Sequence, residues 1–164
     1  RHLPKDAKRA ARWYRKAALG GYAPAQLNLA VMLLEGEGGV ADPTEAFKWL
    51  TAAAEQGHAD GQVALGMMLA LGQGVEADLV EAHKWVTLSS KNGNEDAAAA
   101  LAQLVPKLTD DQLAQSAQRV EAWEASQTPP PSTPVPTPPA EPISPTEPTE
   151  PAGQEAPPTP TAGK

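Results

Sequence analysis

The sequence of 164 residues contains no cysteine. Disulfides, thiolate metal sites and a thiol nucleophile are therefore excluded, whereas the localisation stays open between a bacterial cytoplasm and a periplasm. No apolar run approaches the roughly 20 residues that span a bilayer, so we expect no integral membrane segment. No signal peptide is recognisable either. Because the chain begins at Arg1 inside a helical pattern, we expect an upstream signal or further repeats to be missing from it.

Catalytic and cofactor-binding motifs are also lacking. The sequence has no nucleophile elbow, phosphate loop or H-E-x-x-H motif. The three histidines, His2, His58 and His83, lie too far apart to share a metal ion. We therefore predict no cofactor, no metal site and no catalytic residue.

Negative charge predominates, with a formal net charge of −7, but its distribution is uneven. Residues 1–16 carry seven lysines and arginines against one acidic residue, whereas residues 17–127 carry five basic and 15 acidic residues. An acidic body argues against broad nucleic-acid binding, which relies on cations that neutralise phosphates. We interpret the basic start as a charged outer face or as the contact to a repeat upstream.

Proline is rare before Thr128 and abundant after it, since 14 of the 18 prolines follow that residue. Few aliphatic residues accompany them, so no core can form and we predict a disordered tail over 127–164. Six of these prolines recur at every third residue from Pro136 to Pro151, which is the period of a polyproline II helix. Such a rod could be a spacer, a ligand for proline-binding grooves or a stalk; we favour the spacer or stalk.

The part before the tail contains an internal repeat of 36 residues. Three tryptophans share one position in the repeat, a glycine follows each of them eight residues later, and further leucines and glycines recur in phase. These signature residues are Trp13, Trp49, Trp85, Gly21, Gly57, Gly93, Leu29, Leu65, Leu101, Gly36, Gly72 and Gly74. A fixed period of this length is the signature of a solenoid. We predict an array over 1–126, with repeats over about 6–41, 42–77 and 78–108 and a capping helix over about 109–125.

Each repeat is predicted to form two helices joined by a glycine turn. Asp42 and Asp78 each precede a glutamate by three residues, which is the spacing of an N-terminal helix cap. Gly66 lies inside a predicted helix, where glycine costs about 1 kcal/mol relative to alanine. We therefore expect a close approach between two helices at Gly66.

The helix that covers the end of the array is predicted from a capping box at its N-terminus. Thr109 and Gln112 have the spacing of a capping box. The apolar stripe that follows consists of Leu113, Ala117, Val120 and Trp123. Arg119 falls on the opposite side, which we expect to face away from the array. A terminal helix of this kind is needed because the last repeat of a solenoid has no neighbour to cover it.

Residues 46–66 have the sequence AFKWLTAAAEQGHADGQVALG, and residues 72–78 have the sequence GQGVEAD. These stretches resemble the Sel1-like repeat family, a relative of the tetratricopeptide repeats, with its pattern A-x-x-W-x-x-x-A-A-x-x-G-x-A-x-x-Q-x-x-L-G followed by G-x-G-V-x-x-D. The resemblance covers about residues 6–124. It implies an all-α fold, a right-handed α/α superhelix, and a role as an adaptor in protein complexes. It transfers no catalytic residue, and it implies a structural role for His58, which stands in the turn where the family often has histidine.

The tryptophans allow two interpretations. They could stack on a ligand, or each could be a core residue wedged between the paired helices of its own repeat. Their constant phase with the small alanines favours the core, because aromatic side chains bury large areas.

Candidate binding residues flank the tryptophans. The residues before them are Arg12, Lys48 and Lys84, and the residues after them are Tyr14, Leu50 and Val86. Equivalent positions stack into columns in a solenoid, and such faces are the usual binding surfaces. The cations could meet acidic partners, or they could be a solvated face whose aliphatic stems cover the core. The apolar residues could form a strip beside the cations or pack against the next repeat; we favour packing.

The sequence as a whole predicts an interaction adaptor or scaffold that binds a partner protein or peptide on the surface of its first helices. Two alternatives stay open. One is a hydrolase or regulator associated with the cell envelope, which would need a polar cluster with shifted pKa values in a cleft. The other is a structural spacer without a binding face of its own.

Overall fold

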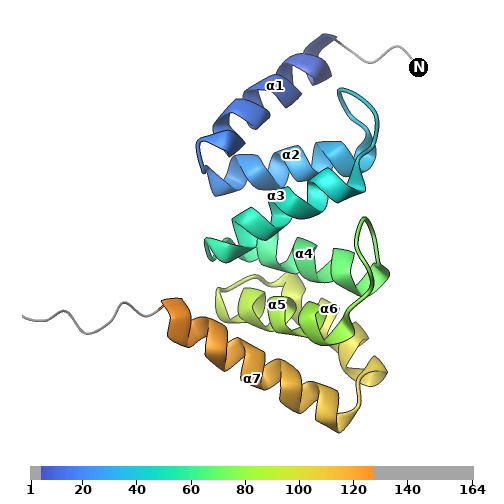
Figure 1. Cartoon of the computed structure of the whole chain (residues 1–164), viewed down its shortest axis with the longest axis vertical. Helices are drawn as coiled ribbons and strands as arrows, with labels where there is room; N and C mark the ends of the chain where they lie inside the picture. The colour runs from blue at the N-terminus through green and yellow to red at the C-terminus, as the bar shows by residue number, and fades with distance from the viewer. Residues whose placement is uncertain (1–4, 128–164) are drawn as a thin grey trace, which may run out of the picture. The chain divides into compact units, whose positions relative to one another are not determined.

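The computed structural model describes the backbone of residues 5–127 and the side chains of residues 7–127. The predictions for the tail and for His2 lie outside these residues. Within them the chain is all-helical (Figure 1). The elements are α1 (Lys5–Leu19), α2 (Ala23–Glu35), α3 (Pro43–Glu55), α4 (Ala59–Leu71), α5 (Leu79–Lys91), α6 (Asp96–Leu104), the 3₁₀ turn η1 (Val105–Lys107) and α7 (Asp110–Gln127).

Consecutive helices pack against one another along the chain, so that each repeat is a helix pair and each pair rests on the next (Figure 1). The first helices of the three repeats are α1, α3 and α5, and the second helices are α2, α4 and α6. The last helix, α7, packs on α5. The predicted solenoid of helix pairs with a capping helix is thereby confirmed.

The predicted helix caps are present. The carboxylate of Asp42 accepts a hydrogen bond from the Glu45 amide at 2.8 Å, and that of Asp78 accepts one from the Glu81 amide at 2.9 Å. His58 caps α4 in the same way, because its Nδ1 accepts a hydrogen bond from the Gly61 amide at 3.2 Å. The predicted structural role of His58 is confirmed. Each cap of this kind stabilises its helix by about 1 kcal/mol.

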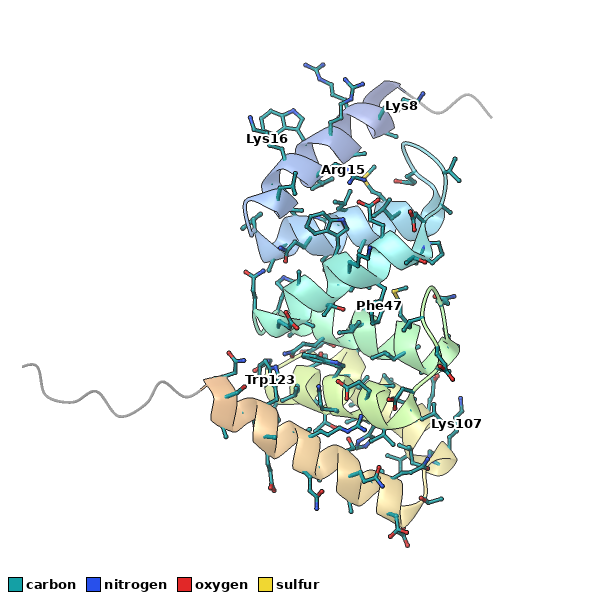
Figure 2. All side chains as sticks on the ribbon, viewed as in Figure 1. Lys8, Arg15, Lys16, Phe47, Lys107 and Trp123 are labelled. Carbon is teal, nitrogen blue, oxygen red and sulfur yellow. The ribbon has the colours of Figure 1, made fainter. Side chains whose placement is uncertain are left out.

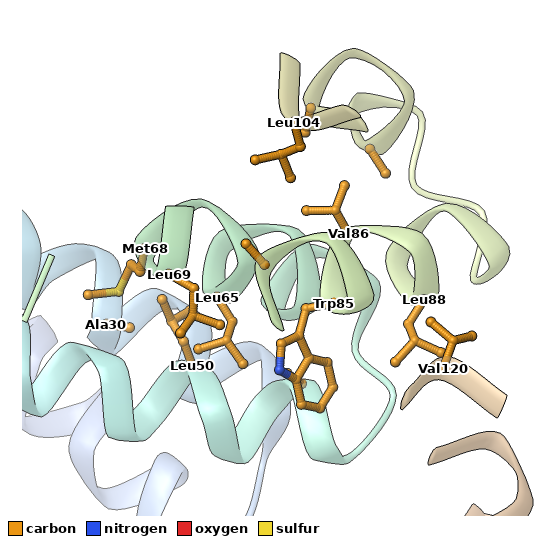
Figure 3. Close-up of a cluster of buried hydrophobic side chains, with 14 of the residues drawn as sticks. Ala30, Leu50, Leu65, Met68, Leu69, Trp85, Val86, Leu88, Leu104 and Val120 are labelled. Atoms are coloured by element: carbon orange, nitrogen blue, oxygen red, sulfur yellow. The ribbon is translucent and has the colours of Figure 1, made fainter. Parts of the chain in front are cut away.

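Buried residues form a core that runs through the stack, and leucines and alanines make up most of it (Figure 3). Leu29 and Leu65 are each 1% exposed, as their equivalent positions predict. Leu101, at the same position of the third repeat, is only half-buried. The third repeat differs because α6 is followed by η1 and α7 rather than by another helix pair.

Gly66 marks the predicted close approach between α4 and α5. A Cβ atom at Gly66 would lie 2.5 Å from Val86 Cγ2 and 3.0 Å from the Ala82 carbonyl oxygen. Ala30, at the equivalent position in α2, is fully buried. Gly74 has a similar role in the turn after α4, where a Cβ atom would lie 2.4 Å from the Pro43 carbonyl oxygen. Gly66 and Gly74 therefore stand where two segments of the chain come too close together for a side chain to fit.

We expect Gly66→Ala to lower the free energy of unfolding by about 1–3 kcal/mol, because overpacking against Val86 outweighs the better helix propensity of alanine. Urea unfolding followed by circular dichroism measures the change. Gly39→Ala is the control, since a Cβ atom there meets nothing within 4 Å. A Gly66→Ala protein as stable as the original would mean that α4 and α5 are further apart.

Candidate interaction surface

The outward sides of α1, α3 and α5 form what we call the first-helix face. Arg12, Lys48 and Lys84 occupy equivalent positions on it. Arg12 and Lys48 are exposed, whereas Lys84 is buried, with only 9% exposure. The predicted column of three accessible cations is therefore wrong at its third member.

The burial of the three tryptophans increases from the first repeat to the third. Trp13 is 69% exposed, Trp49 is half-buried and Trp85 is 5% exposed. The expectation that all three are core residues is wrong for Trp13. Trp49 packs against α1 and α2, but no helix among residues 5–127 precedes α1 and covers Trp13 in the same way. Residues at the same position of different repeats therefore differ in their exposure to solvent.

The apolar candidates are mostly inside the array. Leu50 and Val86 are 1% and 0% exposed, and both belong to the main core. Tyr14 is half-buried against the small cluster of Ala18, Ala25 and Leu29. Packing, the favoured interpretation, describes these residues, and Leu50 and Val86 do not form an exposed apolar strip.

Helix α7 covers the first-helix face at α5. The Trp123 ring meets the Trp85 ring edge-to-face, with centroids 6.0 Å apart and an interplanar angle of 72°. Val120 lies beside Leu88 in the core (Figure 3). Lys84 Nζ forms an ion pair with Glu81 and lies 4.2 Å above the Trp85 ring. The burial of Lys84 and Trp85 thus follows from the helix that packs over them.

The sequence does not predict the polar contacts that Arg119 and Ser116 of α7 make with α5. Arg119, which we expected to face away, has its Nη1 2.8 Å from Glu81 Oε2 and 3.7 Å from Asp78 Oδ2. Ser116 is fully buried and Ala117 is exposed, so Ser116 takes the inward position that we expected for Ala117. The reason is a hydrogen bond between Ser116 Oγ and a ring nitrogen of His83, at 2.8 Å. Periodicity alone favours the apolar residue and cannot reveal this partner.

On α3 the first-helix face is an open groove of about 530 Å³. Its lining residues are Asp42, Thr44, Glu45, Lys48, Trp49 and Ala52. Lys48 is exposed and, within residues 7–127, it forms no ion pair. The groove therefore presents an exposed cation, whose charge also helps to lower the pKa of Glu45, beside a half-buried aromatic ring.

Glu45 connects this groove to α1. Both terminal nitrogens of Arg15 donate hydrogen bonds to its carboxylate, one of them at 3.1 Å, and Trp49 Nε1 donates another at 3.2 Å. The hydrogen bond from Arg15 is the main reason that the pKa of Glu45 lies below its ordinary value. Glu45 is therefore an ionised carboxylate at neutral pH and holds the Trp49 ring in place.

Helix α1 continues the face with a dense group of cations. Among the described side chains of α1, the exposed cations are Lys8, Arg9, Arg12, Arg15 and Lys16. Figure 2 labels Lys8, Arg15 and Lys16. The exposed Trp13 lies among them in the sequence. Arginine and tryptophan are residues that protein–protein interfaces use as anchors.

The described part of the chain holds no group of three or more histidine or acidic side chains placed to bind a metal ion. None of its helices is long and apolar enough to span a bilayer.

Replacing each tryptophan with alanine should destabilise the fold in the order of burial. We expect Trp85→Ala to cost about 3–5 kcal/mol, as large aromatic truncations in cores do. Trp13→Ala should change stability by about 0.5 kcal/mol or less, as exposed substitutions do, and Trp49→Ala should fall between them. Urea unfolding of the three variants gives the order, and equal losses at Trp13 and Trp85 would contradict the packing described.

Acid should loosen the contact between α5 and α7. Burial lowers the pKa of His83 below its ordinary value of 6.5. Because the unfolded chain then binds the proton more tightly, the contribution of neutral His83 is present above pH 6.5 and is lost as the pH falls through the lowered pKa. We expect the free energy of unfolding to fall as the pH drops from above 6.5 through the lowered pKa of His83, and His83→Gln to remove part of that fall. An unchanged pH profile in His83→Gln would show that another group is responsible.

The comparisons with known proteins agree with this architecture. The family model of the Sel1 repeat matches three consecutive segments, residues 2–22, 23–58 and 59–94. Its unit begins at the second helix of one repeat and ends after the first helix of the next, so it divides the array at a different phase from the sequence prediction. None of the curated proteins compared matches the chain.

Two solved structures are similar. One is c5321, a protective antigen of uropathogenic Escherichia coli strains with an SLR fold, at 38% identity and a TM-score of 0.70 over 72% of this chain and 26% of that one. The other is a Sel1 repeat protein from Oxalobacter formigenes, at 36% identity and a TM-score of 0.56 over 58% of this chain and 39% of that one. The chain thus spans well under half the length of either structure. Its repeat signature, its helix pairs and the family match over residues 2–94 lead to one conclusion: this chain belongs to the Sel1 repeat family.

Proposed function

We propose that the chain is a non-catalytic interaction scaffold that binds a partner protein or peptide on the first-helix face of α1 and α3. Sel1 repeat proteins generally mediate protein–protein interactions and are typically non-catalytic. The observation that carries the proposal is the contrast between two equivalent lysines. Lys84 is buried beneath α7, whereas Lys48 is exposed beside an open groove.

The charges of α1 and α3 favour a partner with acidic groups. The cations Arg12 and Lys48 stand on adjacent first helices, and neither forms an ion pair within residues 7–127. The tryptophans beside them offer apolar area that is only partly buried. Tryptophan and arginine are enriched among the residues that contribute most binding energy in protein interfaces, and Lys48 adds a positive charge beside Trp49.

The test is a crosslinking pull-down from a lysate of the source cells with the full chain and two charge-reversal variants. Lys48→Glu changes the proposed face, and Lys107→Glu is the matched control, because Lys107 is an exposed lysine at the other end of the array (Figure 2). We expect partners to be lost with Lys48→Glu and kept with Lys107→Glu, while circular dichroism shows that both variants fold. Partners held equally by both variants would contradict the proposed face, and a chain that captures no partner would favour the structural spacer.

A further inference from the structure

We infer that copies of this chain associate head to tail, with α1 of one copy packing on Ala98, Ala102 and Val105 of α6 in another. This inference goes beyond the proposed function and concerns the two ends of the array, where α1 and α6 lie (Figure 1). Inside the array the same kind of contact occurs twice, because α3 packs on α2 and α5 packs on α4. Each end therefore presents one half of a contact that the chain already makes.

Ala98, Ala102 and Val105, which we call the α6 surface, stand at positions that are buried one repeat earlier. The equivalent residues of α4 are Gln62, Gly66 and Leu69. Those three are buried where α5 packs on α4. The three residues of the α6 surface are all exposed, and Val105 is 41% exposed. The α6 surface therefore has the position of a helix contact without the helix.

The chain continues beyond α6, but α7 does not take the place of a next first helix. It packs on α5 instead, where Arg119 pairs with Glu81 and Trp123 meets Trp85. Repeats of a solenoid are stabilised by the interface that each one forms with its neighbours. The α6 surface lacks the neighbour that α2 and α4 have, and α7 leaves it open to a helix from another molecule.

Helix α1 carries the other half of the contact in Ala10, Tyr14 and Ala17. Their equivalents on α3 and α5 are Ala46, Leu50, Ala53, Ala82, Val86 and Ser89. All six equivalents are at most 1% exposed, whereas the three residues of α1 are partly exposed. Ala10 and Tyr14 line an open groove of about 380 Å³ together with Val31 of α2. This groove lies where a second helix of a preceding repeat would pack.

Two side chains whose exposure is unusual for their position are matched in this arrangement. Trp49 packs against the cluster that contains Leu29, which is 1% exposed. At the equivalent positions, Trp13 is 69% exposed and Leu101 is only half-buried. In a second copy that continues the array by one repeat, Trp13 stands in the same relation to Leu101 as Trp49 does to Leu29. The contact would therefore cover both residues.

The two ends of the array carry opposite charge. Residues 5–19 contain six basic residues and one acidic residue, whereas residues 95–127 contain six acidic and two basic residues. Glu95 and Asp96 are exposed at the start of α6. Opposite charges accelerate association and suppress wrong pairings, because like charges repel. The charges therefore favour α1 meeting α6 over a contact between two identical ends.

A head-to-tail contact joins two different surfaces, so it can repeat from copy to copy. Arg12 would stay accessible in such an assembly, as its equivalent Lys48 does on α3, which already packs on α2. Self-association and partner binding at the first-helix face are thus compatible.

The first test is the average mass of the full chain in solution, followed by sedimentation velocity from about 10 μM to about 1 mM. We expect the mass to rise with concentration. Ala102→Arg should weaken association about tenfold or more, because a long cationic side chain on the α6 surface blocks the helix and repels the cations of α1. Gln103→Arg is the matched control, since it adds the same charge at an exposed position of α6 outside this surface and should change association less than about twofold.

Circular dichroism checks that both variants fold. A chain that is monomeric at about 1 mM, or equal association of Ala102→Arg and Gln103→Arg, would overturn the inference.

A mixing experiment distinguishes head-to-tail association from pairing of identical ends. Val31→Glu blocks the groove beside α1 and keeps the α6 surface, whereas Ala102→Arg blocks the α6 surface and keeps the groove. We expect each variant alone to associate about tenfold more weakly than the original, and their mixture to form one-to-one dimers, because each supplies the half that the other lacks. Leu71→Glu, at an exposed apolar position of α4, is the control for Val31→Glu and should associate as the original does. A mixture that stays monomeric, or association weakened by only one of the two blocking variants, would show that α1 and α6 do not meet.

Discussion

Two buried glutamines set the spacing between neighbouring repeats. Gln26 donates a hydrogen bond to the Ala18 carbonyl at 3.2 Å and accepts one from Gln56 at 2.8 Å. One repeat on, Gln62 bonds the Ala54 carbonyl at 3.1 Å and accepts from Asn92 at 2.9 Å. Each glutamine thus ties the end of its own first helix to the end of the next one. A buried amide left without these partners would cost about 1–3 kcal/mol, so these hydrogen bonds favour one register between neighbouring repeats.

Because the spacing between repeats is constant, the repeats differ in whether another helix covers their first-helix face. The first-helix face carries a cation and a tryptophan in every repeat. At α5 the chain itself covers this pair with α7, which neutralises Glu81 with Arg119 and buries Trp85. At α3 and α1 the pair is accessible. One residue pattern is therefore buried at one end of the array and exposed at the other.

The sequence predicted the features that depend on local geometry or on the period. The 36-residue repeat, the aspartate caps and the close approach at Gly66 all follow from spacing and from the properties of single residues. Exposure did not follow, because a repeat places Trp13 and Trp85 at the same position without showing which helix lies over each. The roles of Arg119 and Ser116 were also missed. Both depend on partners more than 30 residues away, Glu81 and His83, whose approach is set by how α7 lies on α5.

The first-helix face is open at α3 and closed at α5. The most direct measurement is the rate at which an amine-labelling reagent modifies each lysine of the full chain, read by mass spectrometry. Lys48 should react as fast as the exposed Lys107, and Lys84 should react many times more slowly because α7 and Glu81 hold it. Equal rates at Lys48 and Lys84 would contradict the claim, since they would show that α7 leaves the third site as open as the second.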